Sequence, residues 1–293
     1  MSEKQIFLQI YKELEAGNLE LPVLPDLAIK IRDTLRDPHV PIDDASKLVS
    51  IDQSLSAYIL KIANSPLYGG VDPCNDTQSA IIRLGYNSTR NISMTFVLRS
   101  MFKPKLRKLI PHMQKLWVKV SHLAALSAVL AERLTDFEHE MALTAGMMQD
   151  IGALPIITKL SRYPDVFNNP QKVAEIVDRY TARVGALMLH KWNFQEEMVE
   201  VVRSRKDWMR DKSDTPDLAD IVLLARLHSY VGTPHMRRHP PLYKTPAFKK
   251  LGLYKSGPRE SIEVLSEARK EIAEIKQLLP MPEMPVRKRS KLL

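Results

Sequence analysis

The segment from Met141 to Gly152 constrains the fold most, because it is an apolar helix that ends on a polar pair. Three small residues inside it would let a neighbouring helix approach closely: Ala142, Ala145 and Gly146. Gln149 and Asp150 form the polar pair, and Gly152 suits a helix exit because glycine tolerates a positive φ. The pattern predicts a buried helix with a polar C-terminus, where an acid or amide could belong to an active centre.

Composition restricts the class of protein. The chain has 293 residues, of which 44% are hydrophobic and 26% charged, a balance typical of a helix-rich globular protein. It has no run of about 18 apolar residues and no apolar leader, so we expect a cytoplasmic protein that does not enter the membrane. The single cysteine, Cys74, excludes an internal disulfide and a multi-cysteine metal site.

The net charge of +9 favours anionic partners, but the basic residues are unevenly distributed. Many of them lie in a Pro-rich stretch over residues 232–258 and in the tail over residues 281–293. Nucleic acid or an acidic protein surface could use this charge, although a solvated loop is the simpler interpretation. The chain has no helix-turn-helix or zinc-finger spacing, so nucleic acid is not the expected partner.

Apolar periodicity predicts helices along the whole chain. Leu55, Tyr58, Ile59 and Ile62, for example, recur at i, i+3, i+4 and i+7, and Asp52 can cap the helix that they define. Pro and Gly separate the segments. The predicted helices cover residues 4–16, 26–36, 42–64 with an interruption at 52–54, 77–85, 91–102, 116–131, 138–149, 173–189, 217–230 and 261–279.

Four separated motifs in this order resemble the HDOD domain, a bacterial signalling and regulatory relative of the HD phosphohydrolases. They are Leu21–Pro25, Ser50–Asp52, Ile62–Gly69 and Ser79–Gly85. Further along, Trp192–Phe194 looks like the family's Trp-x-Leu-Pro, with Gln195 in place of the proline. The resemblance implies an all-α, HD-domain-like multi-helix bundle with an N-terminal helical subdomain and a C-terminal helix.

The resemblance, together with periodicity and composition along the rest of the chain, predicts a domain organisation. We expect an N-terminal helix in residues 1–20 and an HDOD domain in residues 21–231. The domain would consist of an N-terminal helical part, 21–103, and a degenerate HD-like part, 112–231. Residues 232–258 would be an extended, poorly packed connection, 259–280 a helix, and 281–293 a disordered basic tail.

HD enzymes bind divalent cations through neutral His and ionised Asp side chains. The resemblance places Lys119 at the first His position, Gln149 and Asp150 at the His-Asp pair, Thr181 at a further His, and Ser204–Lys206 at a later His pair. An amide is a poor metal ligand, and Lys119, Arg205 and Lys206 would repel a cation. We therefore expect no metal, no cofactor and no catalytic residues.

Three roles remain open for Asp150. It could cap or tie a helix end, or it could pair with Lys119 or Arg205 so that a salt bridge replaces the metal. Alternatively, Lys119, Arg205 and Lys206 could form with it a polar cluster that binds an anion such as a cyclic dinucleotide.

The sequence thus predicts a non-catalytic signal-transduction or regulatory module that binds an unidentified regulatory protein. "Signalling" rests on the family resemblance alone. The alternatives are a metal-dependent phosphohydrolase with unusual ligands, and a regulator that binds an anion, a nucleotide or nucleic acid.

Overall fold

The periodic apolar segments form helices in the computed structural model, which describes residues 20–70, 72–253 and 258–284 and six positions before them. Those positions are Gln5, Leu8, Gln9, Lys12, Glu13 and Ala16. All regular secondary structure of the described residues is helical, which confirms the predicted all-α fold. Most of the predicted N-terminal helix and of the basic tail lies outside the described residues. None of the described helices is long and apolar enough to cross a membrane.

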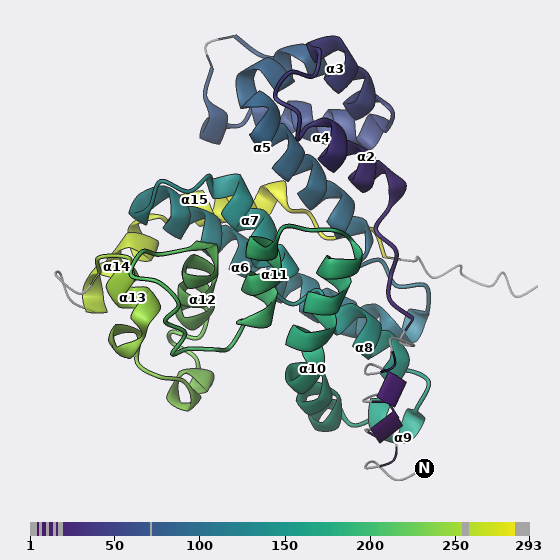
Figure 1. Ribbon diagram of the computed structural model, residues 1–293, viewed down its shortest axis with the longest axis vertical. Helices are drawn as coiled ribbons and strands as arrows, with labels where there is room; N and C mark the ends of the chain where they lie inside the picture. The colour runs from purple at the N-terminus through teal and green to yellow at the C-terminus, as the bar shows by residue number, and fades with distance from the viewer. Residues whose placement is uncertain are drawn as a thin grey trace, which may run out of the picture.

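The first helices form a lobe, at the top of Figure 1, with a hydrophobic core of its own. Its elements are α2 (Asp26–Thr34), α3 (Ile42–Ser50), α4 (Gln53–Ala63), η1 (Pro66–Tyr68) and the first half of α5 (Thr77–Ser100). Ile31, Leu55 and Ile59 are buried in this core. Asp52 caps α4 as predicted, because its carboxylate accepts from the backbone N–H groups of Ser54 and Leu55.

Helix α5 connects the lobe to the main core. The sequence predicted two helices here, the first closed by Gly85, and Gly85 does interrupt the helical backbone of α5 with φ 77° and ψ 166°. The positive φ suits glycine, as predicted, and α5 therefore consists of two helical halves joined by a kink at this residue. Leu84 before the kink packs in the lobe, and Leu98 after it packs in the main core.

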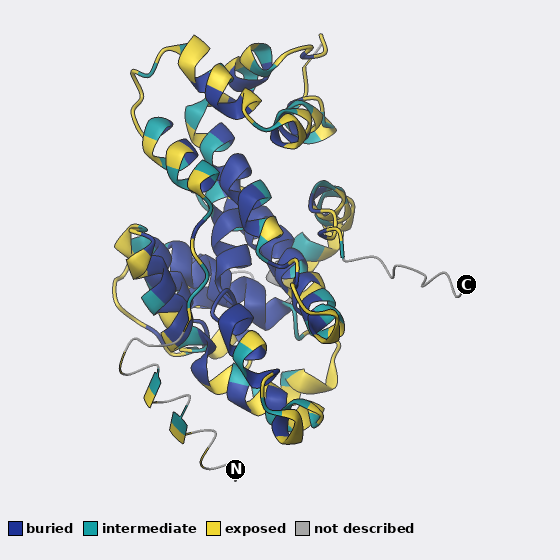
Figure 2. Cartoon of the chain, turned by 90° about the vertical axis from the view of Figure 1, so that its right-hand side faces the viewer, coloured by how far each residue is buried: buried dark blue, intermediate teal, exposed yellow. Residues whose placement is uncertain are grey.

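The main core is built around α6 (Ile110–Leu134), which follows η2 (Arg107–Leu109) and is buried along most of its length. Figure 2 shows these central helices in dark blue. α7 (His139–Met148) packs along α6. A Cβ atom on Gly146 would lie 2.8 Å from the Cα of Ala124, so the small residues of α7 do allow close helix approach, as the sequence predicted.

Gly152 is required for space and not for its backbone freedom, which corrects the sequence prediction. Its φ is −63°, an ordinary helical value. A Cβ atom there would lie 2.2 Å from the carbonyl oxygen of Thr181 and 2.5 Å from the amide nitrogen of Gly185. Gly152 thus allows the start of α8 (Ala153–Leu160) to touch the backbone of α10 (Pro170–Lys191).

The remaining helices of the main core are α9 (Pro164–Phe167), α11 (Glu196–Arg203) and α12 (Leu218–His228). The Pro-rich stretch after α12 folds into η3 (Pro234–Arg238), η4 (Leu242–Lys244) and α13 (Pro246–Lys250), which corrects the prediction of an extended, poorly packed connection. Leu242, Phe248 and Leu253 are buried there. Proline starts η3 and α13, where it needs no backbone N–H.

The predicted C-terminal helix is divided into α14 (Pro258–Glu267) and α15 (Arg269–Leu278), which meet at Ala268. Ala268 and Ile275 are buried against the main core, and Arg133 of α6 pairs with Glu271 at 2.6 Å. The apolar side chains of this segment from Leu265 to Leu279 therefore pack on their own chain.

We expect Gly152→Ala to destabilise the fold by about 3 kcal/mol or more, because backbone atoms of Thr181 and Gly185 cannot yield to the added methyl group. Urea denaturation measures this loss. Gly252→Ala is the matched control, since it adds a methyl group in open space at φ 75° and should cost about 1–2 kcal/mol. A smaller loss for Gly152→Ala than for Gly252→Ala would contradict the packing role.

Candidate functional site

The candidate site is centred on Asp150, which lies in the turn between α7 and α8 and is 1% exposed. Gln149, its neighbour, is the C-cap residue of α7 and is fully buried. An isolated ionised carboxylate at such a depth would be strongly disfavoured. Its partners therefore decide what this site can do.

Three cations from three segments contact the Asp150 carboxylate. The Nη2 atom of Arg205 lies 2.6 Å and the Nη2 atom of Arg226 2.8 Å from Oδ1. The Nζ atom of Lys119 lies 3.0 Å from Oδ2. Lys119 comes from α6 and Arg226 from α12, while Arg205 follows the end of α11. The ion cluster of Asp150, Lys119, Arg205 and Arg226 therefore ties these helices to the α7–α8 turn.

The electrostatic balance keeps Asp150 ionised. Burial opposes ionisation, but Arg205, Arg226 and Lys119 together outweigh it and hold the pKa of Asp150 well below its usual range. Burial also lowers the pKa of Lys119. The charge of Asp150 opposes this shift, and the charges of Arg226 and Arg205 add to it. The site thus holds one buried anion among several cations.

Arg226 is the member of the cluster that the sequence prediction missed. Its side chain is 1% exposed, and its Nε donates to Oε1 of Gln149. One signal could have identified it: Arg226 is the sole Lys or Arg in α12, a helix that is otherwise almost entirely apolar and buried. A buried arginine almost always has an acidic partner.

Lys206, which was predicted to belong to the cluster, contacts a different carboxylate. Its Nζ donates to Asp178 of α10, a residue that the sequence prediction also missed. Arg205 connects the two groups, since its Nη1 donates to the backbone oxygen of Asp178 at 3.1 Å. Thr181 is buried and donates to the backbone oxygen of Val177. The structure thus joins Lys119, Asp150 and Arg205 directly and Lys206 through Asp178.

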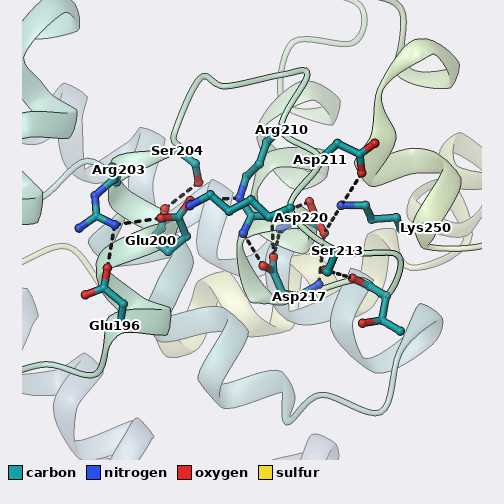
Figure 3. Close-up of polar contacts among 12 residues, drawn as sticks. Glu196, Glu200, Arg203, Ser204, Arg210, Asp211, Ser213, Asp217, Asp220 and Lys250 are labelled. Atoms are coloured by element: carbon teal, nitrogen blue, oxygen red, sulfur yellow. Dashed lines mark hydrogen bonds and ion pairs between the residues drawn. The ribbon is translucent and has the colours of Figure 1, made fainter.

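A second polar network lies beside the first, around the buried Arg210, and Figure 3 shows it. Arg210 donates to Glu200 of α11 and to Asp217 and Asp220 at the start of α12. Lys250 of α13 contacts Asp220 at 3.4 Å. This network fastens the Pro-rich stretch to the main core, which explains why the stretch is folded.

A divalent metal does not fit the donor set around Asp150. The site offers one carboxylate and one amide, and the carboxylate oxygens are already contacted by three cations. A metal ion there would add positive charge beside Lys119, Arg205 and Arg226. Among the residues that the structure describes, no group of three or more His, Cys, Asp or Glu side chains is placed to hold a metal ion.

Sequence comparison identifies a family and a distant relative. A family model described as HDOD domain matches residues 21–208. A protein of Treponema pallidum (strain Nichols), named only as an uncharacterized protein, is 25% identical over 202 residues. That match covers 63% of this chain and 37% of the relative, so the chain spans well under half of the relative's length.

Solved structures show the same fold at low sequence identity. A chain from Shewanella amazonensis SB2B, provisionally named a metal-dependent phosphohydrolase, is similar with a TM-score of 0.78 and 20% identity, covering 95% of this chain and 99% of that one. An HDOD domain protein with unknown function from Geobacter sulfurreducens is similar with a TM-score of 0.66 and 22% identity, and the match covers 94% of this chain and 97% of that one. A chain from Marinobacter aquaeolei VT8, provisionally named a signal transduction protein, is similar with a TM-score of 0.60 and 19% identity. This match covers 94% of this chain and 66% of that one.

We expect Asp150→Asn to lower the free energy of unfolding by about 3–5 kcal/mol, because it leaves Arg226 buried without a charge partner and Arg205 with only its 3.4 Å contact to Asp178. Urea denaturation at neutral pH measures the change. Asp178→Asn is the matched control: its side chain is 49% exposed, so loss of its ion pairs should cost at most about 1 kcal/mol. Equal losses for the two variants would contradict the structural importance of the ion cluster.

Proposed function

Because the chain belongs to the HDOD family, we propose that it is a non-catalytic regulatory module that acts through contacts with other proteins. The observation that carries this proposal is the ion cluster itself. Asp150 stands where the resemblance to HD enzymes expects a metal ligand, and the chain's own cations neutralise it. A site of this kind cannot supply the metal-activated water that HD hydrolysis requires.

The main rival is a phosphohydrolase with unusual ligands. The Shewanella neighbour carries a phosphohydrolase name, and the Marinobacter neighbour carries a signalling name. Both names belong to chains of about 20% identity, so neither name is carried over to this chain, and the proposal is supported by its own donor set. Gln149 and Lys119 favour the regulatory role, because neither side chain binds a divalent cation well.

The lobe of α2–α5 is the surface that we propose for partner contacts. Two of the three most exposed large apolar side chains of the described residues lie on it: Ile82 at 68% and Ile51 at 66%. Ile51 and the start of α5 are held together, since the hydroxyls of Ser50 and Thr77 lie 3.0 Å apart. Exposed apolar side chains on a lobe with its own core are suited to burial against another protein.

The full chain, tagged and cross-linked in its native cells, should capture a defined partner, and Ile51→Asp combined with Ile82→Asp should reduce that capture roughly tenfold or more. The reason is that a charge at a buried apolar contact must be desolvated. Quantitative mass spectrometry of the captured proteins measures the ratio. Tyr243→Asp is the control, since Tyr243 is 49% exposed and lies in η4, outside the lobe.

The same preparation separates the regulatory role from hydrolysis. Incubated with Mn²⁺ or Mg²⁺, the wild-type chain should hydrolyse phosphate mono- and diesters no faster than the metal-containing buffer. Metal-dependent turnover well above this background would contradict a non-catalytic role. Unchanged capture by the double variant would contradict the assignment of the contact surface to the lobe.

A further inference from the structure

The ion cluster and its neighbours hold more positive than negative charge. Lys119, Arg205, Lys206 and Arg226 are balanced only by Asp150 and Asp178, which leaves two cations in excess. Lys119 is the outermost of the three that contact Asp150, with 45% of its side chain exposed against 4% for Arg205 and 1% for Arg226. An anion arriving from solvent would therefore meet Lys119 first.

One buried donor beside Asp150 lacks an acceptor. The Nε2 atom of Gln149 is buried and has no hydrogen-bond partner among the described residues, whereas the side chain of Arg226 contacts Asp150 and Tyr230. Gln149 and Arg226 are each at most 1% exposed. A buried donor without an acceptor costs free energy, so it indicates a position where a ligand oxygen would be favourable.

Aromatic rings border the same cations. Tyr230 and His239 are stacked with centroids 4.3 Å apart, and Trp208 meets the ring of His239 edge-on at 5.2 Å. All three are half-buried, and they come from the segments that flank α12. The side chain of Tyr230 forms a hydrogen bond with that of Arg226. Burial opposes the charge of Arg226, but Asp150 and Tyr230 outweigh it and raise the pKa of Arg226. Cations and accessible rings thus occupy one region.

We propose that this region binds a nucleoside phosphate, with the phosphate at Lys119, Gln149 and Arg226 and the base against Trp208, Tyr230 and His239. Cationic and amide donors recognise the phosphate oxygens, and flat rings recognise the base by stacking. This site goes beyond the proposed regulatory function, since it would give the module a small-molecule input.

A small nucleotide fits these observations better than a nucleic acid strand does. The donor without an acceptor belongs to the buried Gln149, so a terminal phosphate can approach it more easily than a phosphate within a continuous backbone. A strand would depend on surface cations spaced along its path, such as Arg237 and Arg238, which are exposed on η3.

Calorimetry on the full chain with GMP, AMP, cyclic diguanylate, guanosine and inorganic phosphate tests the site, with quenching of tryptophan fluorescence as a second signal. We expect at least one nucleotide to bind more tightly than guanosine or phosphate alone. Lys119→Ala and Trp208→Leu should each weaken that binding roughly tenfold. Lys119→Ala leaves Asp150 its two arginines, so the fold should persist.

Lys47→Ala is the control, because Lys47 is 78% exposed on α3 and far along the chain from the site. Melting curves of all variants distinguish lost binding from lost folding. The proposal is overturned if no nucleotide binds at concentrations up to about 1 mM. It is also overturned if the Lys119→Ala and Trp208→Leu variants are folded and bind the nucleotide as tightly as the wild type, or if inorganic phosphate binds as tightly as the nucleotides. Tighter binding of a single-stranded oligonucleotide than of every nucleotide, with a steep salt dependence, would assign the surface to nucleic acid instead.

Discussion

The buried charge of Asp150 is the constraint on which the rest of the structure depends. An ionised carboxylate at 1% exposure is tolerated only because Arg205, Arg226 and Lys119 reach it from separate parts of the chain. Each of these cations fixes the position of its own segment against the α7–α8 turn. Close packing at Gly146 and Gly152 brings the backbones near enough for the side chains to meet.

This arrangement connects the fold to the function. In HD enzymes a metal ion balances the site carboxylate and also supplies the chemistry. Here the side chains of Arg205, Arg226 and Lys119 provide the balancing charge. In the function that we propose, the regulatory contacts lie on the lobe of α2–α5, and the positive excess around Lys119 is available for an anion.

Local patterns predicted the helices well, and long-range contacts explain what they missed. Periodicity located α4 and Asp52 capped it, because both depend on residues close in sequence. Gly152 was predicted to suit a helix exit because glycine tolerates a positive φ, whereas its real constraint is the backbone of α10, about thirty residues away in the chain. Arg226 was missed because its partner Asp150 is far from it in the sequence, in the α7–α8 turn. The Pro-rich stretch is folded because Lys250 contacts Asp220 and Phe248 packs in the main core.

The ionisation state of Asp150 tests the central claim most directly. Carboxyl ¹³C NMR of the full chain, with Asp150→Glu used to assign the signal, follows this group as the pH is lowered. If three cations hold the carboxylate, its pKa lies well below the ordinary value of about 3.9, and the signal stays that of an ionised group until the fold is lost. Titration of Asp150 at or above that ordinary value in the folded chain would contradict the claim.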